Sequence, residues 1–115
     1  MPPPQPTEIH ANDIFLIRAQ WKLSDDVRPC LVLKSLRQHG VVRVAFLSSA
    51  MDLLDQDGDF VIWDSDPDFA ATGLKKTSYI PGRQPGYDVK RTELGRRLGC
   101  LSGELLKEFD RWSRL

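Results

Sequence analysis

The sequence has few cysteines and no long apolar run, and these two shortages exclude several classes of protein. Cys30 and Cys100 are far apart and form no Cys-x-x-Cys pair, so neither a zinc site nor a redox motif is expected. The longest apolar runs, such as residues 14–17 and 44–47, are far shorter than the roughly 20 residues of a membrane-spanning helix. We therefore expect no membrane-spanning segment and no metal site, and we interpret both cysteines as small buried hydrophobic residues, with a disulfide as the less favoured alternative.

The chain also lacks net charge, because 16 basic side chains balance 16 acidic ones. Binding to a nucleic acid normally calls for a surplus of lysine and arginine. The charges are segregated, however: residues 1–51 carry six basic and four acidic side chains, residues 52–74 carry seven acidic and no basic ones, and residues 75–115 carry ten basic and five acidic ones. A neutral chain of this kind can present one positive and one negative surface, so the class of partner stays open.

Length and composition indicate one small globular domain. The 115 residues are too few for two ordinary domains, and 41% hydrophobic with 28% charged residues is typical of a folded globular protein. The N-terminus, Met1-Pro-Pro-Pro-Gln-Pro, lacks the charged start and apolar run of a secretory signal, so a cytoplasmic location is expected. We predict a flexible proline-rich leader over residues 1–10 and a single domain over residues 11–115.

The pattern of apolar residues predicts a mainly β fold. Strands are expected over residues 13–18, 30–34, 41–48, 60–63 and 76–80. Pro29 cannot donate to a β ladder and should mark the start of the second strand, and His39-Gly40 is a hairpin signal before the third. Short connections between the first three strands favour an antiparallel meander. Asp57-Gly58 indicates a turn, and residues 81–86 are irregular by composition.

The end of the chain has the period of a helix. From Ser102, a plausible N-cap, Leu105, Leu106, Phe109 and Trp112 fall on one face of the expected helix. Residues 94–98 are expected to add a short helical turn. The predicted architecture is a small, strongly curved antiparallel sheet or partly open barrel, capped by one C-terminal amphipathic helix.

Four aspartates between residues 52 and 59 suggest a calcium loop. If Gly58 were the turn glycine of an EF-hand, the first ligand position would be Leu53, which offers no side-chain oxygen. We therefore interpret this segment as a solvated, charged loop.

Two pairs of basic residues could contact phosphates. They are Lys75-Lys76 and Arg96-Arg97, although paired basic residues are also common on a solvated face. Trp21 could stack on a base, although packing in a core or a dimer contact is the more frequent use of a tryptophan.

Several short segments carry a pattern that is more specific in combination. Residues 12–17 open with Asn-Asp and continue as an apolar strand, residues 28–33 form an Arg-Pro-apolar strand, and residues 42–49 form a strand that ends in Ser-Ser. Residues 73–80 and 94–102 then supply a later strand and the approach to the last helix. In this order and spacing, the segments resemble the MazF/PemK family of bacterial toxins.

This resemblance runs over about residues 9–114, and it implies both a fold and an activity. The implied fold is mainly β with a C-terminal helix (α+β), a small SH3-like antiparallel barrel of the MazF/CcdB type, usually assembled as a homodimer. The implied activity is sequence-selective cleavage of single-stranded RNA, often mRNA, to a 2′,3′-cyclic phosphate and a 5′-hydroxyl, inhibited by a cognate antitoxin. The family's catalytic arginine corresponds to Arg28 and its catalytic threonine to Ser48, where serine keeps the hydroxyl.

The chemistry of RNA cleavage suits these two side chains. Attack by the RNA's own 2′-hydroxyl needs no protein nucleophile, metal or cofactor, only alignment of the sugar and stabilisation of charge on the phosphate. Arg28 offers a planar fork of donors that matches two phosphate oxygens, and Ser48 can donate a further hydrogen bond. In the alternative interpretation, Arg28 pairs with Asp25 or Asp26 and Ser48 merely ends a strand.

Other residues are candidates for binding the substrate. They are Ser49, Trp21, Lys75, Lys76 and Arg83. Some branches of the family carry a second arginine and an aspartate, for which Arg83 and Asp88 are nearby candidates, and the general base stays unassigned.

Two alternative functions remain open. The first is a non-enzymatic growth inhibitor on the same fold, similar to the CcdB branch that poisons DNA gyrase by binding. The second is a catalytically degenerate member of the family that serves as a binding module.

Overall fold

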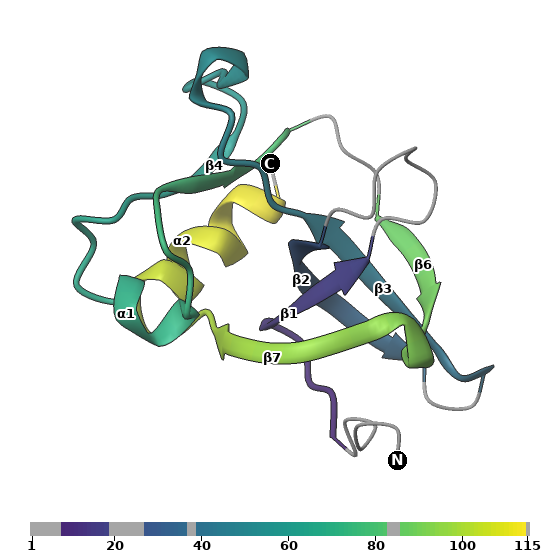
Figure 1. Cartoon of the computed structure of the whole chain (residues 1–115). Helices are drawn as coiled ribbons and strands as arrows, with labels where there is room; N and C mark the ends of the chain where they lie inside the picture. The colour runs from purple at the N-terminus through teal and green to yellow at the C-terminus, as the bar shows by residue number, and fades with distance from the viewer. Residues whose placement is uncertain (1–7, 19–26, 37–38, 83–85, 115) are drawn as a thin grey trace.

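The computed structural model describes residues 8–18, 27–36, 39–82 and 86–114, and Figure 1 shows how their elements are arranged. The strands are β1 (Asp13–Arg18), β2 (Val27–Leu36), β3 (Val41–Phe46), β4 (Phe60–Ile62), β5 (Ser78–Ile80), β6 (Tyr87–Lys90) and β7 (Leu94–Cys100). The helices are α1 (Phe69–Thr72) and α2 (Gly103–Ser113), with short 3₁₀ helices η2 (Met51–Leu53) and η3 (Arg91–Glu93). No described helix is long and apolar enough to cross a membrane.

Five of these strands form one antiparallel sheet. Its order is β6-β3-β2-β1-β7, and β4 pairs with β5 in a separate two-stranded sheet. The first three strands of the chain lie side by side, which confirms the meander that the sequence predicts. β2 is longer than expected, because it begins two residues before Pro29 rather than after it. Pairing with β1 holds this extension, in which Arg28 lies opposite Ile17 and Pro29 opposite Leu16.

The prediction of a helical turn over residues 94–98 is wrong, because this segment belongs to strand β7. β7 pairs along β1 at the edge of the sheet, and long-range pairing outweighs the local apolar spacing that suggested a helix. The sequence also did not predict α1 or β6. Both are only four residues long, too short for a periodic pattern to identify them.

The five-stranded sheet is strongly curved, as expected, without closing into a barrel. Irregularities in the pairing of β1 with β7 and of β2 with β3 bend the sheet. The edge strands β6 and β7 are joined directly by η3, and Val89 of β6 and Leu94 of β7 enter the same buried cluster. The edges therefore approach each other although they are not hydrogen-bonded neighbours, which makes a partly open barrel.

Two apolar clusters cover the two faces of this sheet. One contains Phe15 and Ile17 of β1 and Cys30 and Val32 of β2, together with residues of β3, β6 and β7. It also contains Ile9, which is 2% exposed although it falls in the segment predicted as a leader; residues 1–7 lie outside the described part.

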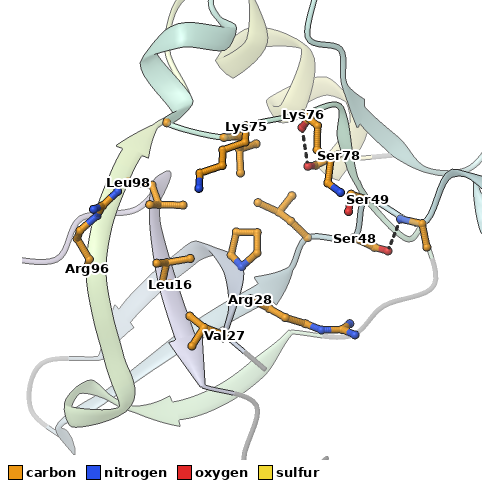
Figure 2. A pocket seen from close by; sticks show the side chains of 15 residues that line it. Leu16, Val27, Arg28, Ser48, Ser49, Lys75, Lys76, Ser78, Arg96 and Leu98 are labelled. Carbon is orange, nitrogen blue, oxygen red and sulfur yellow. Dashed lines mark hydrogen bonds between the residues drawn. The ribbon is translucent and has the colours of Figure 1, made fainter. Parts of the chain in front are cut away.

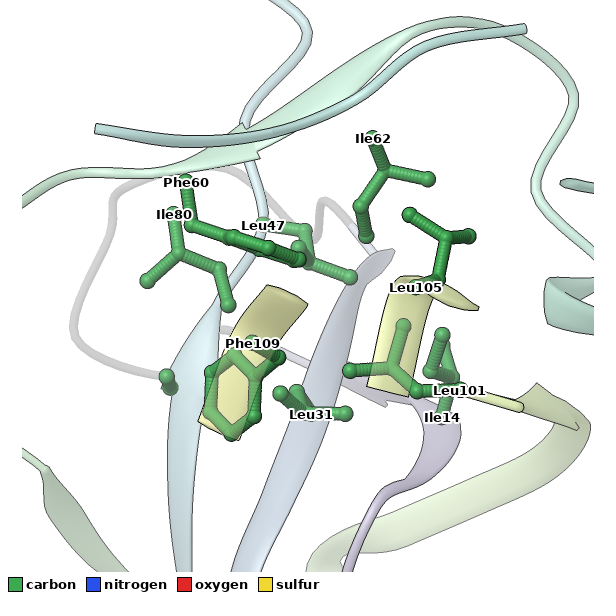
Figure 3. Close-up of a cluster of buried hydrophobic side chains, with 10 residues drawn as sticks. Ile14, Leu31, Leu47, Phe60, Ile62, Ile80, Leu101, Leu105 and Phe109 are labelled. Carbon is green, nitrogen blue, oxygen red and sulfur yellow. The ribbon is translucent and has the colours of Figure 1, made fainter. Parts of the chain in front are cut away.

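The second cluster joins the sheet to β4, β5 and α2 (Figure 3). In it, Phe109 lies edge-on to Phe60 with ring centroids 5.3 Å apart, as the predicted apolar face of the helix requires. The indole N–H of Trp112 donates to the Gly58 carbonyl at 2.9 Å, which ties the helix to the Asp57-Gly58 turn.

Both cysteines are free. Cys30 is fully buried in β2, and Cys100 at the end of β7 is half-buried. Burial raises the pKa of the Cys30 thiol from 9.0 to about 12, and a backbone hydrogen bond with Phe15 opposes this shift.

Candidate active site

A groove of about 550 Å³ opens where the start of β2, the segment after β3, the segment after α1 and strand β7 meet (Figure 2). Its apolar lining comes from Leu16, Val27, Pro29, Leu47, Ala50, Gly73, Leu74 and Leu98. Its polar lining comes from Arg28, Ser48, Ser49, Lys75, Lys76, Ser78 and Arg96. Five of the candidate residues that the sequence singles out, Arg28, Ser48, Ser49, Lys75 and Lys76, therefore meet here with Arg96.

The register of β2 and β3 brings Arg28 and Ser48 together. Cys30 pairs with Phe46, and the Leu47 N–H then donates to the Pro29 carbonyl at 3.1 Å. Continued by one more residue, this register sets Arg28 opposite Ser48, and directly opposite residues project from the same face of a sheet. Figure 2 shows both side chains on the same side of the groove.

Arg28 is half-buried near the start of β2. Its backbone pairs with Ile17 of β1, and Pro29, which follows it, restricts the backbone conformation of Arg28. Among the described residues, no hydrogen-bond or ion-pair partner engages its guanidinium. The alternative partners Asp25 and Asp26 lie outside the described residues.

Ser48 is fixed where the chain passes from the large sheet to the small one. Its N–H donates to the Tyr79 carbonyl at 2.9 Å, and the Tyr79 N–H donates back to the Ser48 carbonyl at 2.8 Å. The Ser48 hydroxyl oxygen accepts a hydrogen bond from the Ala50 N–H at 3.2 Å. This bond uses an oxygen lone pair, so the hydroxyl proton is free to donate to a phosphate.

Lys75 and Lys76 enter the groove from the segment after α1. Gly73 ends α1 in the left-handed conformation, with φ of 71°, and so turns the chain toward the groove. The Ser78 hydroxyl donates to the Lys76 carbonyl at 2.9 Å, which holds the backbone of this segment. Both lysines are exposed, as is Ser49.

The pair Arg96-Arg97 is divided between two faces of β7. Arg96 lines the groove, whereas Arg97 donates to the buried carboxylate of Asp13 at 3.2 Å. Successive side chains of a strand point to opposite faces, which explains the division. The sequence suggested a phosphate contact for either pair, and a strand assignment of residues 94–100 would have indicated that only one of the two arginines faces the groove.

The groove is positively charged. Four cationic side chains line it, Arg28, Lys75, Lys76 and Arg96, and no described lining residue carries a carboxylate. Such a site attracts anions, and guanidinium and ammonium groups bind phosphate oxygens well.

Solved structures with a similar fold include "Mycobacterium tuberculosis toxin MazF-mt6", which is 19% identical to this chain. The match has a TM-score of 0.62 and covers 87% of this chain and 90% of that chain. This chain has a MazF-like toxin fold. No protein-family model matches the sequence, and a search of curated proteins finds no match.

The MazF-like fold confirms the resemblance that the segment order indicated, including the antiparallel sheet and the C-terminal helix. Two candidate binding residues, Trp21 and Arg83, lie outside the described residues. Asp88 does not line the groove. It accepts a hydrogen bond from the Arg43 guanidinium at 2.9 Å, and this bond, aided by the opposite charge, lowers the pKa of the Asp88 carboxyl.

The acidic segment, residues 52–59, does not line the groove, and its aspartates form hydrogen bonds within the segment. Asp55 and Asp59 accept backbone hydrogen bonds within it, from the Asp57 N–H at 3.1 Å and from the Asp55 N–H at 2.9 Å. Asp59 also accepts from the Gly82 N–H at 2.8 Å. The described residues contain no group of three or more His, Cys, Asp and Glu side chains placed to hold a metal ion.

Proposed function

We propose that this MazF-like protein is a toxin that cleaves single-stranded RNA, including mRNA, in a sequence-selective and metal-independent reaction. Arg28 and Ser48 are the catalytic residues in this proposal. The observation that carries it is that Arg28 and Ser48 line one groove together with three further cations, Lys75, Lys76 and Arg96. The MazF-like fold supports the same reading.

In the proposed reaction, the 2′-oxygen of the RNA attacks the adjacent phosphorus. A new bond forms between phosphorus and the 2′-oxygen, and the bond between phosphorus and the 5′-oxygen breaks. The 2′-hydroxyl gives up its proton and the departing 5′-oxygen takes one up, so the products are a 2′,3′-cyclic phosphate and a 5′-hydroxyl. Arg28 stabilises charge on the non-bridging oxygens, and Ser48 donates to the same phosphate or orients the sugar.

The proposal includes partners and a location. As in the family that the sequence resembles, we propose a homodimer in the cytoplasm, inhibited by a cognate antitoxin. Ser49, Lys75 and Lys76 are proposed to contact the RNA strand on either side of the reacting phosphate, because they line the same groove. Trp21 and Arg83 stay predictions for the same role.

The direct test is incubation of the purified protein with long single-stranded RNA in EDTA, followed by analysis of the fragment ends. We expect cyclic phosphate ends, a loss of cleavage of about 100-fold or more in Arg28→Ala, and a loss of about 10- to 100-fold in Ser48→Ala. Ser48→Thr keeps the hydroxyl and should retain activity. Arg111→Gln is the matched control, because it also removes one exposed positive charge, from α2 outside the groove.

The alternatives predict different results. Absence of Arg28-dependent cleavage on every RNA tested would contradict the proposal. Growth arrest with intact RNA, retained by Arg28→Ala, would favour the non-enzymatic inhibitor. Absence of both cleavage and growth arrest would favour the binding module.

A further inference from the structure

We infer that Arg96 and Lys75 form a second phosphate-binding wall, which holds a backbone phosphate of the RNA next to the one that is cleaved. The inference rests on the proposed function and deepens it, because it divides the groove into a reacting side and a holding side. Arg28 and Ser48 act on the reacting phosphate. Arg96 and Lys75 act on binding and on the position of the strand.

Arg96 is free to take this role because of its place on β7. It is exposed, lines the groove, and has no ion-pair or hydrogen-bond partner among the described residues. Its neighbour Arg97 is engaged by Asp13, whose side chain is only 8% exposed. Arg97 therefore has a structural partner, whereas the guanidinium donors of Arg96 are available to a ligand.

The backbone packing of α1 against β7 fixes Lys75 relative to Arg96. Gly73 at the end of α1 faces the Leu98 carbonyl so closely that a Cβ atom would overlap it. Gly99 of β7 likewise faces the Ala71 carbonyl at a distance that leaves no room for a Cβ atom. These two close approaches hold the segment that carries Lys75 against the strand that carries Arg96.

The positions of the cations divide the groove into two sides. Figure 2 shows Arg96 on β7 across the groove from Arg28 and Ser48, with Lys75 between them. The floor between the walls is apolar, from Leu16, Pro29 and Leu98 among others. A single strand carries a phosphate at every nucleotide, so a strand that presents one phosphate to Arg28 can present another to Arg96 and Lys75.

The test uses the full chain and a mixed-sequence oligonucleotide of 2′-O-methyl RNA, which can bind but cannot be cleaved because its 2′-oxygen is blocked. Arg96→Gln and Lys75→Gln should each weaken its binding about three- to tenfold, as expected for loss of one charge-assisted contact. The plot of log affinity against log salt concentration should become shallower by about 0.7 for each cation removed. Arg111→Gln should leave both quantities unchanged.

Cleavage kinetics on unmodified RNA then separate holding from reacting. Arg96→Gln and Lys75→Gln should raise KM about three- to tenfold and leave kcat within about twofold, whereas Arg28→Ala should lower kcat. Thermal unfolding of each variant confirms that it is folded. A salt slope and KM equal to those of the wild type in both Gln variants would overturn the inference, and so would a loss confined to kcat.

Failure of the two proposals is distinguishable. If the wild type cleaves RNA and the Gln variants bind the probe like the wild type, the proposed function stands and the second wall is wrong. If no cleavage occurs but both Gln variants lose affinity and salt slope, Arg96 and Lys75 bind the strand and the proposed reaction is wrong.

Discussion

Arg28 and Ser48, the proposed catalytic residues, illustrate how the fold brings together residues that are distant in the sequence. Neither residue has a sequence motif that would identify it alone, and 20 positions separate them. The ladder between β2 and β3 removes that separation, because the hydrogen bond from Leu47 to Pro29 extends the pairing to the site. Tyr79 then fixes the backbone of Ser48 from the second sheet, and the Ser48 hydroxyl oxygen accepts a hydrogen bond from the Ala50 N–H.

Cys30 provides a prediction at the same scale, on stability as a function of pH. The thiol has a pKa of about 12 in the folded protein against an ordinary value of 9.0, because it is buried. The folded state therefore keeps its proton where the unfolded state loses it. Stability is unaffected below about pH 9 and falls as pH rises from there toward 12, by about 1 kcal/mol at about pH 10.

Urea unfolding at about pH 8 and about pH 10 measures this effect. Cys30→Ala is the control, because it removes the thiol and keeps every other titrating group, including Cys100. The comparison uses the change between the two pH values, since the smaller side chain also lowers stability at both. An equal loss in the wild type and in Cys30→Ala would contradict the prediction.

At the scale of elements, α2 shows a cap that comes from elsewhere in the chain. Ser102 occupies the N-cap position, as the sequence predicts, but its side chain makes no capping hydrogen bond. The Asp68 carboxylate, at the start of α1, instead accepts from the Glu104 N–H at 3.0 Å. A carboxylate at this end of the helix also interacts favourably with the helix dipole.

This arrangement predicts unequal effects of two substitutions. Asp68→Ala should lower the free energy of unfolding by about 1 kcal/mol, because it removes the cap. Ser102→Ala should change it by less than about 0.5 kcal/mol, as for a side chain without a special contact. Urea unfolding of both variants checks this, and a larger loss in Ser102→Ala than in Asp68→Ala would show that the serine is the true cap.

The edge strand β7 has two functions at this scale. Its pairing with β1 completes the sheet, and its packing against α1 places Arg96 and Lys75 on the same groove. In a helical turn at residues 94–98, Arg96 and Arg97 would point in other directions, because helical side chains repeat every 3.6 residues rather than every two. The wrong prediction therefore concealed that Arg96 and Arg97 lie on opposite faces of a strand.

At the scale of the whole molecule, the zero net charge is the sum of an acidic region and a separate basic region. The acidic residues between 52 and 74 lie in η2 and in the turns before and after β4, where several of their carboxylates accept backbone hydrogen bonds. The groove has four cations and no carboxylate among its described lining residues. The zero net charge of the sequence is thus compatible with local attraction of a polyanion.

This separation predicts the chemistry of the proposed antitoxin. We expect a largely disordered acidic segment that folds along the sheet and covers Arg28, because acidic side chains complement the groove and ordering on binding suits regulation. Its affinity for the toxin should fall with added salt, and the complex should no longer bind 2′-O-methyl RNA. Titration calorimetry at two salt concentrations measures the first, and a structure of the complex with Arg28 open to solvent would contradict the prediction.

The class of the fold follows from the amino-acid sequence alone, because the features that indicate it are local. Alternating apolar residues predict β1 and β3, Asp57-Gly58 predicts a turn, and the spacing of Leu105 and Phe109 predicts α2. The order of segments also indicated the MazF-like fold, and with it Arg28 and Ser48 as candidates.

Which side chains meet depends on the three-dimensional fold. The pairing of β2 with β3 brings Arg28 and Ser48 to one groove, and the pairing of β7 with β1 leaves Arg96 in that groove and Arg97 with Asp13. The hydrogen bond from the Glu104 N–H makes Asp68 the cap of α2. Each of these depends on hydrogen bonds and close packing between segments far apart in the chain. Local periodicity shows which residues share a face of one element, whereas register and packing decide what that face meets.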